Sequence, residues 1–314
     1  MAGRLPSSTW VSRRARRAWA SRLVRAVPVR LRRLDTATLD RFYSELRGSG
    51  GVGGRPLAPA TVRQVHAILR RALDQAARWG WVPANPAALA SPPRLGSAEI
   101  QPPTPEEVSR LLETAYEADP DFAVLLWMAA TTGARRGELC ALRWGSIDLE
   151  AAELVIVRSL FQAAGRLVEK DTKTHAARRL ALSDDSVALL DEHRRRCSER
   201  AEACGVRLSD EAYVFSFDPA GRQPMHPDSV THRFSRLATQ LGLRARLHDL
   251  RHYAATQLIA GGVDLRTVSG RIGHAGGGAT TLRVYTHFLA AADRQAAEVL
   301  EKTLRRPRRS SSES

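Results

Sequence analysis

Residues 247–261 place basic side chains at the start of an apolar helical pattern. The stretch reads LHDLRHYAATQLIAG, and His248, Arg251 and His252 fall near its beginning. His248 and Arg251 are three residues apart, so on a helix they share one face, and the free N–H groups of a helix N-terminus favour an anion. The pair therefore suits a phosphate group. In an isolated H-x-x-R pattern the histidines would more often cap or pack, with the arginine as a surface charge.

Two further segments supply the reactive groups that such a pair lacks. In TTGARRGELCALRW, Gly133 precedes Arg135, and Glu138 follows one helical turn later. In RIGHAGGGATTLRVYTHF, His274 follows a glycine, and Tyr285 comes eleven residues after it. These segments bring a second arginine, an acid, another imidazole and a phenol into the same region of the chain.

These residue types together can perform phosphoryl transfer. A tyrosine hydroxyl with a pKa of about 10 is a poor nucleophile at neutral pH, so Tyr285 needs nearby positive charge and a proton acceptor such as His248. Arginine stays charged and offers a planar fork for two phosphate oxygens, so Arg135 and Arg251 can clamp a phosphodiester. His274 can hold the same phosphate by a hydrogen bond.

Taken in order, TGARRGEL, HDLRH, GHAGGGATT and VYTH resemble the tyrosine recombinase family of the phage integrase type. The resemblance implies that Arg135 and Arg251 are the two catalytic arginines, His248 and His274 the catalytic histidines, and Tyr285 the nucleophile. Glu138 is implied as the supporting acid. Arg136 is a rival for the first arginine, but the T-G-x-R spacing favours Arg135.

The family also uses a lysine on a β-hairpin. The stretch DTKTHAARRLAL resembles its K-T-x-x-S-x-R pattern, with Lys173 at the lysine position and Ala177 where serine is common. Only three of the 48 basic residues are lysines, and two of them, Lys170 and Lys173, fall in this hairpin. Lys170 lacks the context that follows Lys173. A lysine of lowered pKa can act as a general acid, which suits Lys173 for protonating a departing 5′ oxygen. An ordinary exposed turn lysine remains the alternative.

The implied reaction is attack by Tyr285 on a DNA phosphate, giving a 3′-phosphotyrosine link and a free 5′ hydroxyl that later attacks a partner strand. The link retains the bond energy, so no cofactor is expected, and no lysine follows a glycine as a P-loop requires. No metal is expected, since His193, Cys197 and Cys204 do not match a zinc spacing. The resemblance also implies double-stranded DNA attachment sites, a homotetramer on DNA and a C-terminal helix within residues 290–304 that docks on a neighbouring subunit. An accessory DNA-bending or directionality protein is a further candidate partner.

The composition favours a nucleic-acid partner. The net charge is +15 with a sequence pI near 11, an excess that needs an acidic partner such as DNA or an anionic membrane surface. No run of 18 apolar residues is present for a membrane span, and the N-terminus lacks the apolar core of a signal peptide. We therefore expect a cytoplasmic, nucleoid-associated protein with no membrane partner.

The hydrophobic patterns predict a mainly α fold with a small β-sheet, an α+β protein in two domains. A basic segment at 1–33, with ten arginines and no acid, precedes a helical domain at 34–95 that resembles the family's core-binding domain. A linker at 96–103, within a proline-rich stretch, leads to a mixed α/β catalytic domain at 104–304. A basic, serine-rich tail at 305–314 follows. Family members commonly carry a further helix before the first domain, so we expect the N-terminal segment to be a natural short form, a mis-assigned start or a decayed element.

Within the helical domain, DTATLDRFYSEL predicts a helix that begins after an N-cap. A second helix, 61–80, carries an apolar stripe and ends at Gly80. The stripe comprises Val62, Val65, Leu69, Ala72, Ala76 and Trp79.

In the catalytic domain, Thr104, Pro105 and Glu107 predict a capped helix start, and FAVLLWMAATTG predicts a buried helix. A short helix, RRGELCALRW, follows. The segments ELVIVRSL, GRLVEK and ARRLALS then predict three strands. Beyond them the pattern is helical through to DRQAAEVLEKTLRR, apart from AYVFSF.

Three functions compete at this point. The first is an active site-specific recombinase or integrase that acts in integration or excision of a mobile element, and it is favoured because every proposed catalytic position carries a suitable residue. The second is a catalytically idle, DNA-binding remnant of an integrase, which the short N-terminus favours. The third is a type IB topoisomerase, which shares the tyrosine chemistry but relaxes supercoils as a monomer.

Overall fold

The structure is a computed structural model that describes residues 31–95, 101–163, 165–171 and 177–273. The chain divides into two compact units, Met1–Glu99 and Ile100–Ser314. The finer domain limits at 34–95 and 104–304 stay a prediction. The basic segment before residue 31, the tail and the helical pattern of 293–306 lie outside the described residues.

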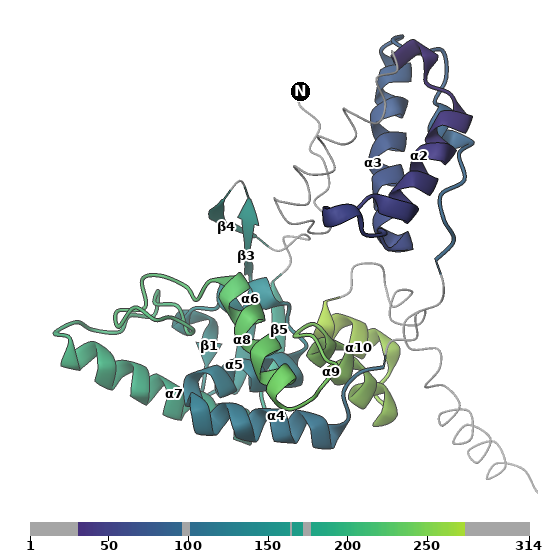
Figure 1. Ribbon diagram of the computed structural model, residues 1–314. Coiled ribbons are helices and arrows are strands. Elements are labelled where there is room, and N and C mark those ends of the chain that lie inside the picture. Colours follow the sequence, from purple (N-terminus) through teal and green to yellow (C-terminus); the bar gives the residue numbers. More distant parts are fainter. Residues whose placement is uncertain (1–30, 96–100, 164, 172–176, 274–314) are drawn as a thin grey trace, which may run out of the picture. The chain divides into compact units, whose positions relative to one another are not determined.

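The first unit is built on two helices, α2 (Thr36–Ser49) and α3 (Pro59–Arg78), with short 3-10 turns η1 (Leu31–Arg33), η2 (Val52–Gly54) and η3 (Pro86–Ala88) (Figure 1). The predicted N-cap is confirmed, because Asp35 Oδ1 accepts a hydrogen bond of 2.8 Å from the backbone N–H of Thr38. Phe42 and Tyr43 of α2 pack with Val62 and Val65 of α3 in the core of this unit.

The apolar stripe predicted on α3 is partly wrong. Val62, Val65 and Ala76 are buried as expected, but Leu73 takes the place expected for Ala72, which is exposed. With 3.6 residues per turn, Leu73 falls on the same face as Val62, whereas Ala72 is rotated by about a quarter turn. Trp79 is 58% exposed because the helix ends at Arg78, ahead of Gly80 with φ 70°.

The second unit starts with two helices whose ends agree with the sequence. In α4 (Pro105–Ala118) the backbone N–H of Thr104 donates to Glu107 Oε2 at 2.9 Å and the backbone N–H of Glu107 donates to Thr104 Oγ1 at 3.2 Å. This arrangement confirms the predicted capping box. Helix α5 (Pro120–Thr132) is buried along nearly its whole length, as its continuous apolar sequence predicts, and contacts α4, α7 and α9. It leads into the short helix α6 (Arg136–Cys140).

The β structure differs from the prediction of three strands. After the turn η4 (Trp144–Ser146), strands β1 (Ile147–Asp148), β2 (Glu153–Ile156) and β5 (Arg178–Ala181) form an antiparallel sheet in the order β1-β2-β5. Strands β3 (Arg158–Ala163) and β4 (Arg166–Asp171) form a separate hairpin. The segment ELVIVRSL is therefore two strands that break at Val157, because β2 pairs with β5 whereas β3 pairs with β4.

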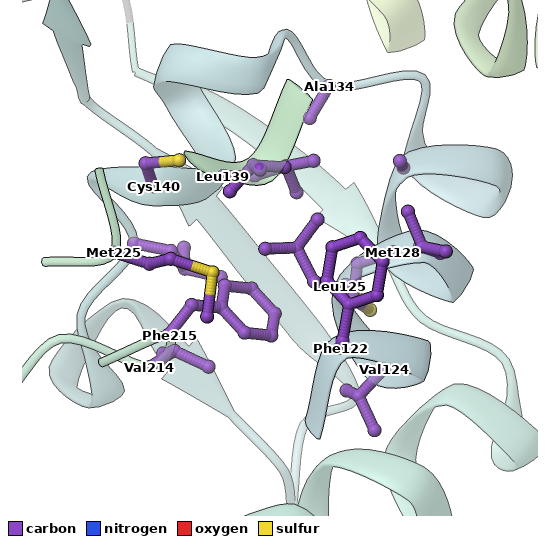
Figure 2. Packing of buried hydrophobic residues seen from close by; sticks show 14 of the residues in the cluster. Phe122, Val124, Leu125, Met128, Ala134, Leu139, Cys140, Val214, Phe215 and Met225 are labelled. Carbon is purple, nitrogen blue, oxygen red and sulfur yellow. The ribbon is translucent and has the colours of Figure 1, made fainter. Parts of the chain in front are cut away.

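The remaining helices complete the unit. They are α7 (Asp184–Ala203), α8 (Pro227–Gln240), α9 (Asp249–Ala260) and α10 (Leu265–Ile272). Figure 2 shows the core, in which Phe122, Leu125 and Met128 of α5 face Leu139 of α6 and Phe215 of the segment between α7 and α8. This packing fixes α5 as the central helix from which the next segments start. None of the helices in the described ranges combines the length and the apolar character that crossing a membrane requires.

Candidate active site

The candidate site forms where α5 ends. Gly133 follows the helix in the left-handed conformation, with φ 62° and ψ 18°. A Cβ at this residue would lie 2.8 Å from Cγ2 of Ile272 in α10, so both the backbone angle and the close approach require glycine. Its backbone then turns the chain toward Arg135, which is extended at the start of α6.

Arg135 and Glu138 are joined at this turn. Nη1 of Arg135 donates to Glu138 Oε1 at 2.8 Å, and the backbone N–H of Arg135 donates to Glu138 Oε2 at 2.9 Å. Nη2 of Arg135 donates to the carbonyl of Gly273 at 2.7 Å. The Arg135 side chain is still 46% exposed, whereas that of Glu138 is 5% exposed. The buried acid thus holds a guanidinium that faces solvent.

A second arginine holds the same carboxylate from the sheet. Nη2 of Arg178 in β5 donates to Glu138 Oε2 at 2.9 Å. Burial disfavours the ionised form of Glu138, but the positive charges of Arg178 and Arg135 outweigh it and keep the pKa of this carboxyl below its usual value. Glu138 is therefore an anion at neutral pH.

Arg251 reaches the same turn from α9. It is 3% exposed, and its Nη1 donates to the carbonyl of Gly133. Arg271 of α10 donates from Nη2 to the carbonyl of Thr131 at 3.3 Å and to that of Ala181 at 3.2 Å. The last carbonyls of a helix have no partner within it and carry partial negative charge, so the end of α5 attracts both guanidiniums.

His248 immediately precedes α9, and it lies close to Arg251 and Arg135. Its ring lies 5.0 Å from that of His252, edge to face. Desolvation by the surrounding protein, with added repulsion from His252, Arg251 and Arg135, lowers the pKa of His248 to about 4. With this pKa the ring is neutral at neutral pH, and because the residue is exposed to solvent it is available to a ligand as a proton acceptor.

Arg136, the rival of Arg135, points elsewhere. Its Nη1 donates to Asp228 Oδ1 at 3.2 Å and to Thr231 Oγ1, both on α8. The structure therefore brings Arg135, Glu138, His248 and Arg251 together at the end of α5 and turns Arg136 toward another helix. Lys170, the rival of Lys173, lies on β4 with its Nζ 4.5 Å from the centroid of the Phe161 ring.

The sequence interpretation did not single out Arg178, although the chain carries a signal for it. Side chains alternate between the two faces of a strand, so Arg178 shares a face with the buried Leu180, while Arg179 shares the exposed face with Ala181. An arginine on the inward face of a strand needs a buried acceptor, which Glu138 supplies.

Three predicted catalytic residues, Lys173, His274 and Tyr285, lie outside the described residues. His193 and Cys197, which were considered as metal ligands, belong to a different cluster. The imidazole of His193 contacts Asp121 Oδ1 at 3.0 Å and the carbonyl of Val214 at 2.8 Å.

Comparison with known proteins identifies integrases and tyrosine recombinases as relatives, which agrees with the residues found at the site. Residues 103–291 match the Phage integrase family. An integrase from Saccharopolyspora erythraea is 26% identical over 283 residues, covering 73% of this chain and 62% of that protein. A tyrosine recombinase XerC-like protein from Caldanaerobacter subterraneus subsp. tengcongensis is 26% identical over 295 residues, covering 85% and 71%.

Solved structures share the fold. The Tn1549 transposon integrase in complex with transposon right end DNA superposes with a TM-score of 0.71 at 15% identity, covering 94% of this chain and 95% of that one. A lambda integrase dimer bound to a core site gives a TM-score of 0.59 at 18% identity, covering 88% and 89%.

The helical fold with its small antiparallel sheet, and the match over more than half of the chain, define a tyrosine recombinase fold. The chain belongs to the Phage integrase family. Its aligned part spans less than two thirds of the length of the Saccharopolyspora erythraea relative.

Proposed function

We propose that this chain is a site-specific DNA recombinase that cleaves and rejoins DNA through a 3′-phosphotyrosine intermediate, acting in integration or excision of a mobile element. One observation carries the proposal. Arg135 and Arg251, which come from motifs far apart in the sequence, meet at the end of α5 with the neutral His248 beside them. Family membership and the relatives named integrase or tyrosine recombinase support the same reaction.

In the proposed cleavage step, Arg135 and Arg251 bind the non-bridging oxygens of one phosphodiester. The Tyr285 oxygen attacks the phosphorus while His248 takes the phenolic proton, and the bond to the 5′ oxygen breaks. Lys173 gives its proton to that oxygen, and His274 holds the phosphate. Rejoining is the reverse step, with a 5′ hydroxyl from a partner strand as the nucleophile. A guanidinium clamp of this kind suits DNA because it binds the phosphate in any sequence.

The assembly that we propose follows the relatives. Structures of integrases have been solved on DNA as a dimer and as a tetramer on a Holliday junction, so we propose that this chain acts as a homotetramer on double-stranded attachment sites in the nucleoid. An accessory protein that bends the DNA or sets the direction of the reaction is part of this proposal.

The test is formation of a covalent protein–DNA adduct. Nicked duplexes tiled across the DNA that flanks the gene for this chain are incubated with the wild-type protein and with Tyr285→Phe, and the products are resolved on a denaturing gel. We expect an adduct with the wild type alone and equal DNA binding by both proteins.

Two other outcomes would contradict the proposal. DNA binding without an adduct on any duplex would indicate a catalytically idle remnant. An adduct together with supercoil relaxation by a monomer, and no joining of two duplexes, would indicate a type IB topoisomerase.

A further inference from the structure

The guanidinium of Arg178 lies between two parts of the candidate site. Its Nη2 donates to Glu138 Oε2, the oxygen that also accepts the backbone N–H of Arg135. Its side chain is 15% exposed, so water competes little for these contacts. Arg178 is anchored in the sheet, because its strand pairs with β2 at Ile156.

Gly273, the residue that precedes His274, lies against the same guanidinium and leaves no room for a side chain of its own. A Cβ added at Gly273 would lie 1.8 Å from Nη1 of Arg178, and Gly273 has a φ of 67°. The end of an arginine side chain can usually move aside, but moving this one would break its ion pair with Glu138. The carbonyl of Gly273 accepts a hydrogen bond from Nη2 of Arg135.

Arg178, Glu138, Arg135 and Gly273 therefore form one connected network of contacts. This network joins strand β5, the start of α6 and the end of α10. Without Arg178, the donors that Glu138 keeps within the described part of the chain are those of Arg135. Arg135 and the backbone that leads into His274 then lose their common support.

We propose that Arg178 is a positioning residue of the DNA-cleavage site, which holds Glu138 and Gly273 so that Arg135 meets the scissile phosphate in one orientation. This inference rests on the proposed function. Arg178 acts through Glu138 in this scheme, without touching the phosphate itself. Loss of such support displaces a reacting group by a fraction of an ångström to an ångström, which slows a positioned reaction by up to about 100-fold.

The experiment measures the single-turnover rate of adduct formation at saturating DNA, together with the DNA dissociation constant and the melting temperature. The variants are Arg178→Ala, Arg178→Lys and Arg179→Ala. Arg179 is the matched control, because it is the next residue of β5, its side chain is 72% exposed and its partner is the exposed Glu153. We expect Arg178→Ala to lower the rate roughly 10- to 100-fold, with the dissociation constant within about twofold of wild type. Arg178→Lys should recover part of the rate, and Arg179→Ala should match wild type.

A double-mutant cycle with Glu138→Gln separates positioning from a general structural role. If Arg178 acts through Glu138, adding Arg178→Ala to Glu138→Gln should slow cleavage by less than about threefold further. Full additivity of the two effects, or a wild-type rate in Arg178→Ala, would overturn the inference. A loss of rate matched by a similar loss in Arg179→Ala would also overturn it. Absence of an adduct with the wild-type protein would instead contradict the proposed function.

Discussion

Each end of helix α5 lies near a carboxylate that pairs with several cations, and the histidines at the two ends are in opposite protonation states. At the N-terminal end, Asp121 Oδ1 contacts His193 Nδ1 and Arg196 Nε at 3.0 Å each, and Oδ2 accepts from Arg200. Desolvation opposes protonation of His193, but the hydrogen bond to Asp121 outweighs it, with smaller contributions from Cys197, and raises its pKa to about 9. At the other end, the pKa of His248 falls to about 4.

The acceptors around each ring explain the difference. The Val214 carbonyl and the ionised Asp121 can only accept, so both nitrogens of His193 donate and the ring is an imidazolium. His248 instead lies beside His252, Arg251 and Arg135, whose positive charges disfavour its protonation. The negative charge of Asp249 only partly offsets them. An imidazolium held between two protein acceptors stabilises the fold, whereas a neutral imidazole beside two arginines is suited to accept a proton next to an external anion.

The largest expected effect is at the cation-rich end. Arg251→Lys keeps the charge but loses the planar fork, so we expect cleavage at saturating DNA to fall by about 10²- to 10³-fold. Arg179→Lys, on the exposed face of β5, is the control and should cleave like wild type. The single-turnover adduct assay measures both. A fall of less than tenfold in Arg251→Lys would argue against a phosphate clamp.

At the other end, a substitution should change stability and leave cleavage unaffected. Asp121→Asn removes the charge that His193, Arg196 and Arg200 share, and we expect unfolding to become easier by about 2 kcal/mol, since the carboxylate is partly solvated. Asp210→Asn, in a solvent-exposed pair with Arg194, is the control and should have little effect. Urea unfolding measures the stability, and adduct yield per folded molecule should stay at the wild-type level. A slower cleavage rate in Asp121→Asn would remove the distinction between the two ends.

The loss of a proton from His193 should lower the free energy of unfolding at alkaline pH. Its folded pKa lies above the unfolded value of about 6.5, so its contribution is complete below pH 6.5 and is lost as the pH rises through about 9. We expect a loss of about 2 to 3 kcal/mol over this range, measured by urea unfolding at several pH values. In His193→Gln this loss should disappear. An unchanged profile in that variant would show that another group titrates there.

The smallest expected effect is that of mild acidification on the cleavage rate, because His248 should not change its protonation state. Because its pKa is about 4 in the free protein, the ring stays neutral on mild acidification. The cleavage rate at subsaturating DNA, which reports the free protein, should therefore change by less than about twofold between pH 7.5 and pH 5.5. A tenfold fall over this range that persists in His274→Asn would contradict the low pKa of His248.

Local signals in the sequence predicted the elements well, because they depend on neighbouring residues. The capping box at Thr104, the N-cap at Asp35 and the continuous apolar run of α5 each act within a few residues. The motif spacing also predicted a recombinase fold. Pairings between distant segments gave less signal, so the break at Val157 and the hairpin of β3 and β4 were missed.

The candidate site was predictable to the extent that its residues lie in short motifs. Arg135 and Arg251 stand in such motifs, and the structure places both at the end of α5. Arg178 was missed because its role depends on a carboxylate forty residues earlier in the chain, which only the folded sheet brings within 2.9 Å. Trp79 was misplaced for a different reason, since its apolar character gave no sign that the helix would end one residue before it.

The contact between Gly273 and Arg178 also limits how this chain can diverge. Since a methyl group at 273 would occupy the position of the Arg178 guanidinium, Gly273 cannot gain a side chain unless Arg178 also changes. Among homologous chains, a side chain at the position of Gly273 should therefore occur together with a shorter residue at the position of Arg178. The pair should co-vary although 94 residues of sequence lie between them.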